Sequence, residues 1–170
     1  MTIARVLDRL YLLCGYLSAF FLAMIAVLTL AQIICRQLAF PLETSELSGF
    51  CLAASTFFGL SHTLVKGEHV RVSLFEGLSS AALRRTLEMW CCAIGALVAA
   101  FATYNVALFA RDSHTFGDLS PGLMAVPMWI PQGTLVLGLG MLTIAFLHQL
   151  VRLMAGRMPQ YLDKTTVLED

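Results

Sequence analysis

The chain has 170 residues, of which 58% are hydrophobic and only 13% charged, and its 11 basic residues balance its 11 acidic residues. Soluble domains contain about 25% charged residues, so a soluble fold of this size would lack the polar surface to cover such a composition. The balanced charge comes without a basic tract that has interleaved aromatic residues, and this argues against nucleic-acid binding.

Four long stretches contain no Asp, Glu, Lys or Arg: Leu10–Cys35, Leu47–Val65, Met89–Ala110 and Met128–Val151. A helix rises about 1.5 Å per residue, so about 20 apolar residues cross a hydrocarbon core about 30 Å thick. The stretches hold 26, 19, 22 and 24 residues, and each is therefore long enough. We predict an all-α membrane protein with a single four-helix transmembrane domain over residues 1–157 and a loose tail over residues 158–170.

The Lys and Arg residues are divided unevenly between the two sides of these spans. Nine of the 11 precede the first span, lie between the second and third, or follow the fourth, and only Arg36 and Arg111 fall in the other two connections. Basic residues in short connections stay on the cytoplasmic side of a membrane. The pattern predicts a multi-pass protein with both termini in the cytoplasm.

Two short amphipathic segments flank the spans. Apolar residues recur every four positions at Val70, Leu74 and Leu78, and residues 3–10 show a similar helical periodicity. Each segment fits a short helix lying in the plane of the lipid headgroups, but each also fits a simple extension or link between spans. Both readings stay open at this point.

The first two spans each carry a stripe of small and polar residues. Such stripes are where helices associate in lipid, because the lipid is itself as apolar as leucine. Antiparallel pairing of the stripes predicts two sets of neighbours: Gln32 and Arg36 with Ser45 and Ser48 at the outer end, and Gly15 and Ser18 with Gly59 and His62 at the inner end. A weaker stripe on the fourth span includes Gly138 and Ala145, and Tyr104 and Asn105 on the third span are expected to form interhelical hydrogen bonds.

The middle of each span lacks the charged residues and the central prolines that usually mark a solute pathway. The nearest acidic residues are Glu43 and Glu46, at the outer entrance of the second span. They are expected to stabilise the N-terminus of that helix and to pair with Arg36. These features indicate a membrane scaffold rather than a pathway.

Two other classes of function remain as alternatives. His62 and His148 lie near the cytoplasmic ends of their spans and could ligate one haem, as in a membrane redox subunit. A small exporter that works as an oligomer is the second alternative, although such a protein needs a membrane-embedded carboxylate. The five cysteines show no metal-binding spacing, and no phosphate-binding glycine motif is present, so neither a metal centre nor an enzyme is indicated.

The order of these features resembles one known family. Span two begins at Glu46 and ends in a basic-Gly-x-His-hydrophobic-basic-hydrophobic pattern formed by Lys66, Gly67, His69, Val70, Arg71 and Val72. Span four opens with Pro127-Met128-Trp129, followed by Pro131 and Gly133. Over residues 1–157 the chain resembles the small membrane subunit of tripartite ATP-independent periplasmic (TRAP) transporters, the DctQ-type family. It departs from that family at Ser73, where an acidic residue is expected.

The resemblance implies that three proteins share the work of transport. A larger membrane subunit would bind substrate and sodium and move as an elevator. A periplasmic substrate-binding protein would deliver an organic acid of the C4-dicarboxylate or sugar-acid class. This chain would be a non-enzymatic scaffold in the bacterial inner membrane that braces the large subunit and holds no cofactor of its own.

Two sets of contact residues are expected on this reading. Contacts with the large subunit are expected from the smooth apolar side of span two and from the segment that follows it: Glu46, Phe50, Ala53, Phe57, Leu60, Val70, Leu74 and Leu78. Contacts with lipid headgroups are expected from basic and interfacial aromatic residues: Arg71, Arg84, Arg85, Trp90 and Trp129.

Overall fold

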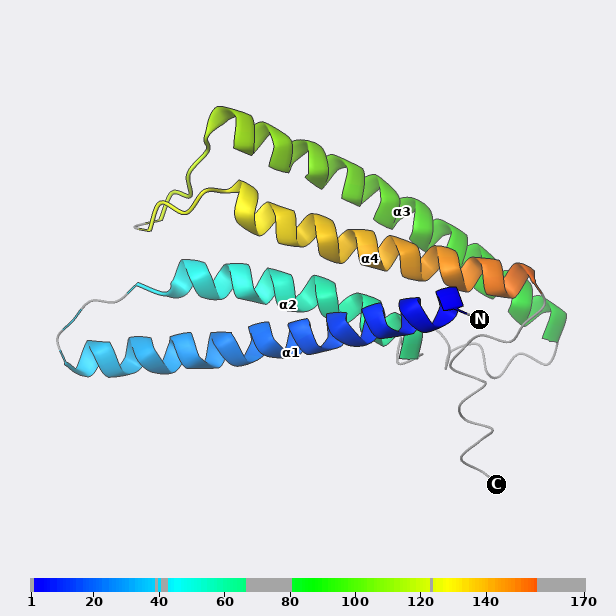
Figure 1. Ribbon diagram of the computed structural model, residues 1–170, viewed down its shortest axis with the longest axis horizontal. Helices are drawn as coiled ribbons and strands as arrows, with labels where there is room; N and C mark the ends of the chain where they lie inside the picture. The colour runs from blue at the N-terminus through cyan, green and yellow to red at the C-terminus, as the bar shows by residue number, and fades with distance from the viewer. Residues whose placement is uncertain (1, 39, 41–42, 67–80, 123, 156–170) are drawn as a thin grey trace, which may run out of the picture.

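The computed structural model describes residues 2–38, 40, 43–66, 81–122 and 124–155. These residues form four helices (Figure 1): α1 (Thr2–Gln37), α2 (Ser45–Lys66), α3 (Ala81–Phe116) and α4 (Trp129–Met154). Each helix is long and apolar enough to cross a membrane. The structure therefore confirms the all-helical fold with four potential membrane spans.

Two of the helices, α1 and α3, extend well beyond the charge-free stretches that predicted them. α1 and α3 have 36 residues each, which at about 1.5 Å per residue makes each of them about 54 Å long. The added turns carry charged residues such as Arg9 and Arg111, which can reach headgroups or water while the backbone stays helical. Residues 3–10 are not a separate interfacial helix, because α1 is continuous from Thr2. The segment Val70–Leu78 and the tail after residue 157 lie outside the described residues.

The four helices lie in a flat row rather than around a common axis (Figure 1). The main contacts join α1 to α2, α2 to α4 and α4 to α3, so the order across the row is α1, α2, α4, α3. The α1–α2 and α3–α4 pairs are antiparallel hairpins, and α2 and α4 run parallel to each other in the middle. Each edge helix, α1 or α3, therefore has one main neighbour within the chain.

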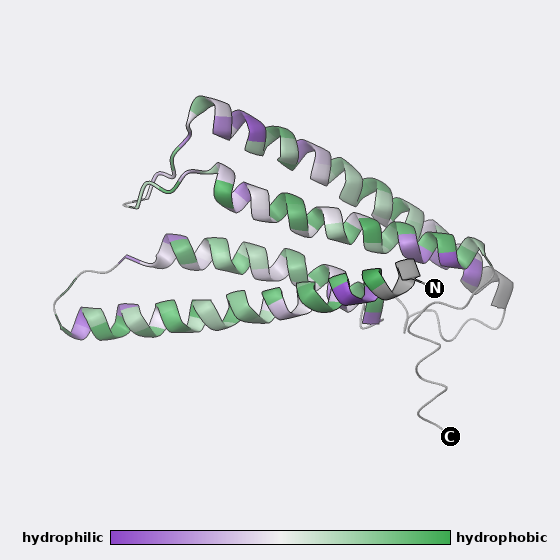
Figure 2. Cartoon of the chain, in the orientation of Figure 1, coloured by the Kyte–Doolittle hydropathy of each residue, from purple (hydrophilic) through white to green (hydrophobic). Residues whose placement is uncertain are grey.

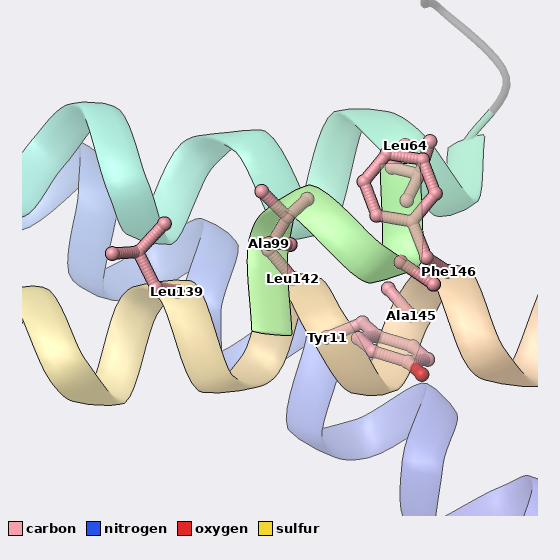
Figure 3. Close-up of a cluster of buried hydrophobic side chains, with 8 residues drawn as sticks. Tyr11, Leu64, Ala99, Leu139, Leu142, Ala145 and Phe146 are labelled. Atoms are coloured by element: carbon pink, nitrogen blue, oxygen red, sulfur yellow. The ribbon is translucent and has the colours of Figure 1, made fainter. Parts of the chain in front are cut away.

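The two ends of the row differ (Figure 1). The N-terminus and the last turn of α4 lie at one end, which we name the terminus end, and both hairpin connections lie at the other, which we name the loop end. All four helices contribute to an apolar cluster toward the terminus end (Figure 3): Tyr11, Leu64, Ala96, Ala99, Leu139, Leu142, Ala145 and Phe146. Burial of Ala145 confirms that the weak stripe on span four faces the interior.

Glycines bring the central helices into close contact. A Cβ atom added at Gly138 of α4 would lie 2.7 Å from Phe57 Cβ and 3.1 Å from the Phe57 carbonyl carbon. In the α3–α4 pair, the ring of Phe146 packs into the space above Gly95, where an added Cβ would lie 2.6 Å from the ring. Association in lipid depends on such close packing, since apolar surface gains little by leaving an apolar solvent. The junction between the two hairpins therefore depends on Gly138.

Candidate functional site

The most extensive candidate site is the exposed apolar surface of the row. Figure 2 shows hydrophobic residues along the middle of the helices, with the most hydrophilic residues mainly near their ends. No residue in the most apolar 18-residue stretch of α1 is buried against the rest of the chain. In a membrane such a surface is covered by lipid or by another membrane protein. Polar groups on or near this surface can indicate which parts of it are covered by protein rather than by lipid.

Reciprocal hydrogen bonds join α1 to α2 midway along the hairpin. Ser18 Oγ donates to the Ser55 carbonyl at 2.8 Å, and Ser55 Oγ donates to the Ser18 carbonyl at 3.0 Å. A Cβ atom added at Gly59 would lie 3.0 Å from Ser18 Oγ, so the glycine makes room for this contact. The predicted meeting of the two polar stripes is confirmed here.

The two histidines considered as haem ligands both contact Tyr11. The backbone carbonyl of Tyr11 accepts a hydrogen bond from His62 Nδ1 at 2.9 Å, and the His148 ring stacks on the Tyr11 ring with centroids 6.4 Å apart. His62 also packs against Gly15, as predicted, since an added Cβ there would lie 2.9 Å from the imidazole. Each imidazole is thus packed against α1, and this arrangement does not support haem ligation by the two histidines. Among the described residues, no three potential metal ligands gather together.

At the loop end, the hairpin is closed by a buried threonine. Thr44, which is 2% exposed, donates from Oγ1 to Gln32 Oε1 at 2.9 Å. The sequence predicted that Gln32 and Arg36 would lie beside Ser45 and Ser48. Gln32 instead bonds the residue just before them, and the Arg36 side chain is exposed.

Glu46, in the first turn of α2, has its carboxylate against Gly122 in the connection between α3 and α4. The carboxylate occupies the space that a side chain at position 122 would need. Its Oε1 atom is buried and has no hydrogen-bond partner among the residues that the structure describes. The ion pair predicted with Arg36 is absent from this arrangement, in which Arg36 and Glu43 are both exposed. A buried carboxylate oxygen without a partner is costly, so Glu46 is a place where another molecule could complete the polar contacts.

The smooth side of α2 is partly covered within the chain. Phe57 packs against Gly138, and both Phe57 and Leu60 pack on the apolar cluster. Phe50 and Ala53 are half-buried. Part of this side thus meets a neighbouring helix, because an apolar helix face has the same pattern whether it meets lipid or protein. Phe57 and Leu60 are also only half-buried, so contact of all four residues with a partner stays a prediction.

The expected headgroup residues have different environments. Arg85 Nη2 donates to the Leu153 carbonyl at 2.8 Å, in the last turn of α4. Carbonyls in the last turn of a helix lack intrahelical partners and carry partial negative charge, so Arg85 stabilises that helix end. Trp90 and Trp129 are exposed, and lipid binding by them stays a prediction. Several candidates lie outside the described residues or have undescribed side chains: Val70, Arg71, Leu74, Leu78 and Arg84.

Two polar residues of α3 point away from the rest of the chain. Asn105 is exposed, and its Nδ2 donates to the Phe101 carbonyl of the same helix at 2.8 Å. Tyr104 is 65% exposed. Neither forms the interhelical bond predicted for it within the described part of the chain; the side of α3 that faces α4 instead places the Thr103 hydroxyl 3.3 Å from that of Thr143.

The chain matches a known family model. Residues 24–156 match the model described as "Tripartite ATP-independent periplasmic transporters, DctQ component". This range includes residues 24–37 of α1, all of α2, α3 and α4, and both Glu46 and Gly138. Comparison with curated proteins and with solved structures found no match.

Proposed function

Since this chain belongs to the DctQ-component family of TRAP transporters, we propose that it braces the large membrane subunit of such a transporter without carrying substrate itself. One observation carries this proposal. The apolar stretches of all four helices contain no Asp, Glu, Lys or Arg, the groups that usually mark a pathway for polar solutes. A membrane component that lacks such a pathway serves a companion that has one.

The flat row of helices supports a bracing role. A compact bundle would turn one side of every helix toward a shared centre, whereas in this row α1 and α3 each have one main neighbour and all four helices expose large apolar residues (Figure 1). A transporter whose substrate domain moves through the membrane needs a wide stationary frame. A row of helices joined along its length can widen such a frame more than a bundle of the same four helices.

The exposed side of α3 is the surface that we assign to the large subunit. Asn105 and Tyr104 lie within the predicted third span, where exposed polar groups face hydrocarbon unless a protein covers them. Interhelical hydrogen bonds from such groups favour association between membrane helices. Asn105 uses one amide N–H on the Phe101 carbonyl of its own helix, and its second N–H and its carbonyl oxygen remain to bond a partner. On α1, by comparison, the exposed Thr29 hydroxyl donates its only proton to the Ile25 carbonyl of its own helix. The polar side of α3 is therefore better suited to a protein partner than α1 is.

Replacement of Asn105 by leucine tests this assignment. The Asn105→Leu variant is expected to keep the stability of the isolated chain, because its amide bonds only its own helix. Its affinity for the large subunit is expected to fall about 5- to 30-fold, which corresponds to about 1–2 kcal/mol for one hydrogen bond between membrane helices. Binding of the two purified subunits in lipid nanodiscs gives the measurement. The matched control is Thr29→Val on α1, and equal weakening by both variants would contradict the assignment.

We also propose the finer features of the transport reaction. The transported solute is an organic acid of the C4-dicarboxylate or sugar-acid class, delivered by a periplasmic binding protein, and the sodium gradient drives uptake. Sodium and substrate bind to the large subunit. The uneven distribution of Lys and Arg supports an orientation in which the terminus end is cytoplasmic and the loop end, with Arg36 and Arg111, is periplasmic.

Reconstitution of the subunits separately and together tests the function. Vesicles that contain this chain alone are expected to accumulate no succinate or gluconate above empty vesicles, with or without a sodium gradient. Vesicles that contain both membrane subunits, supplied with the binding protein, are expected to accumulate the cognate acid only with sodium outside. Removal of this chain from that mixture should reduce uptake. Accumulation by the chain alone would contradict the scaffold function and favour the self-oligomerising exporter.

A further inference from the structure

An apolar groove of about 600 Å³ opens between α3 and α4 near the loop end. The groove exists because three of the residues that line it are small: Ala107 and Ala110 on α3 and Gly133 on α4. A Cβ atom added at Gly133 would meet nothing within 4 Å. Thr134 also lines the groove, but its hydroxyl donates to the Pro131 carbonyl at 2.7 Å. The groove therefore presents no unsatisfied side-chain hydroxyl to an occupant.

Polar and aromatic residues lie at the mouth of the groove. Arg111 follows Ala107 by four residues, so the two share one side of α3, with Arg111 a turn nearer to the loop end. His114 continues the same side, and its ring packs edge-on against the Trp129 ring with centroids 5.5 Å apart. Arg111 is exposed and forms no ion pair within the part of the chain that the structure describes. The groove thus has an apolar floor and a cation at the membrane surface.

We propose that this groove binds one phospholipid, with an acyl chain along Ala107, Gly133 and Leu137 and the phosphate on Arg111. The arginine guanidinium matches the geometry of phosphate oxygens, and Trp129 lies at the depth where headgroups meet acyl chains. A bilayer offers little hydrophobic gain for a lipid tail. Occupancy is favoured instead by dispersion contacts with the floor of the groove and by the charge at its mouth.

The shape of the groove favours a lipid tail over a protein helix. A helix with its side chains is about 10 Å across, whereas the groove is a furrow between two helices that pack directly against each other. A single acyl chain is narrow enough to follow such a furrow. The cation at the mouth also complements a lipid phosphate. This inference concerns the chain itself and does not depend on its role in uptake.

Photo-crosslinking in vesicles tests the proposal. The full chain is reconstituted in phosphatidylethanolamine and phosphatidylglycerol with a trace of phospholipid that carries a photoreactive group on its acyl chain. Crosslinks are expected to concentrate on Trp129–Leu137 and Ala107–Arg111 rather than on the exposed apolar stretch of α1. Gly133→Leu starts its side chain in open space, since a Cβ there meets nothing within 4 Å, and it places a better helix former in α4. The variant is expected to keep the fold and fill the groove, so that labelling falls to the level seen on α1.

The contribution of the cation is measured separately. Arg111→Gln is expected to reduce phospholipid retained during detergent extraction about tenfold, the effect of losing one charge-assisted hydrogen bond. Arg36→Gln, the other arginine at the loop end, is the matched control and should change nothing. Three results would overturn the proposal: equal labelling of α1 and the groove, unchanged labelling in Gly133→Leu, or phospholipid retention that Arg111→Gln leaves unchanged.

Discussion

Replacement of Gly138 by leucine is expected to separate the two helical hairpins while all four helices stay in the membrane. Gly138 lets the α4 backbone approach Phe57 of α2 so closely that even a Cβ atom would lie 2.7 Å from Phe57 Cβ and 3.1 Å from its backbone carbonyl carbon. The neighbouring backbone cannot move aside as the end of a flexible side chain can. Overpacking by a few carbons costs about 1–3 kcal/mol, and a leucine at a backbone contact should reach the upper end of that range or exceed it.

A matched pair of alanine variants isolates this effect. Gly138→Ala is expected to destabilise the chain by about 1–3 kcal/mol, offset in part by about 1 kcal/mol of better helix propensity. Gly140→Ala gains the same propensity, but its Cβ would meet only Thr103 Cγ2 at 4.0 Å, so it should be neutral or slightly stabilising. Unfolding by sodium dodecyl sulfate measures the free-energy differences.

The separation itself can be followed by distance. Spin labels at exposed Val27 on α1 and Val98 on α3, in a chain whose native cysteines are replaced, report the width of the row. The distance distribution should broaden in Gly138→Leu and keep its shape in Gly140→Ala. A narrow, unshifted distribution in Gly138→Leu would show that the hairpins are held together elsewhere.

Pairing within the α1–α2 hairpin could be predicted because lipid removes the usual driving force for burial. Only small and polar residues then favour one side of a helix over another. Ser18 and Gly59 stand on such stripes, and their contact follows from antiparallel pairing alone. The same reasoning placed Gln32 within one residue of its true partner, Thr44.

The flat row could not be predicted in the same way. The α2 side that contains Phe57 and Leu60 is continuously apolar, and a lipid-facing side would have the same residues. Whether this side of α2 meets lipid or protein is decided by a single glycine on α4, which Phe57 contacts. This contact joins two helices that are separated in the sequence. The sequence marked Gly138 as part of a stripe but gave no indication of which helix it would contact.

The contact between Glu46 and Gly122 was beyond prediction for a related reason. It joins the start of α2 to the connection between α3 and α4, and it exists only because α2 and α4 are neighbours in the row. Local chemistry pointed to Arg36, the nearest basic residue in the sequence. The path of the chain instead takes Glu46 toward the other hairpin, and the orphaned oxygen could be found only from three-dimensional structure.

Removal of the Glu46 charge is expected to affect assembly with the large subunit and spare the stability of the isolated chain. Within the described residues its Oε1 atom is buried without a partner, so the chain alone bears the cost of desolvating the carboxylate and gains no hydrogen bond. Glu46→Gln and Glu46→Leu should therefore leave that stability unchanged or raise it. If the large subunit supplies the missing donor, the complex loses a charged hydrogen bond, which costs about 2–5 kcal/mol and weakens association about 30-fold or more.

Two neighbouring residues provide the controls for this second prediction. Glu43→Gln removes an exposed acid at the same end and should change neither stability nor association. Arg36→Gln should also be silent; if it reproduced the loss of association caused by Glu46→Gln, an ion pair within this chain would be the better explanation. Binding between the purified subunits and detergent unfolding of the isolated chain give the two readouts. A complex that assembled normally but bound substrate more weakly would instead place Glu46 on the transport pathway, because a bracing residue acts on assembly before it can act on affinity.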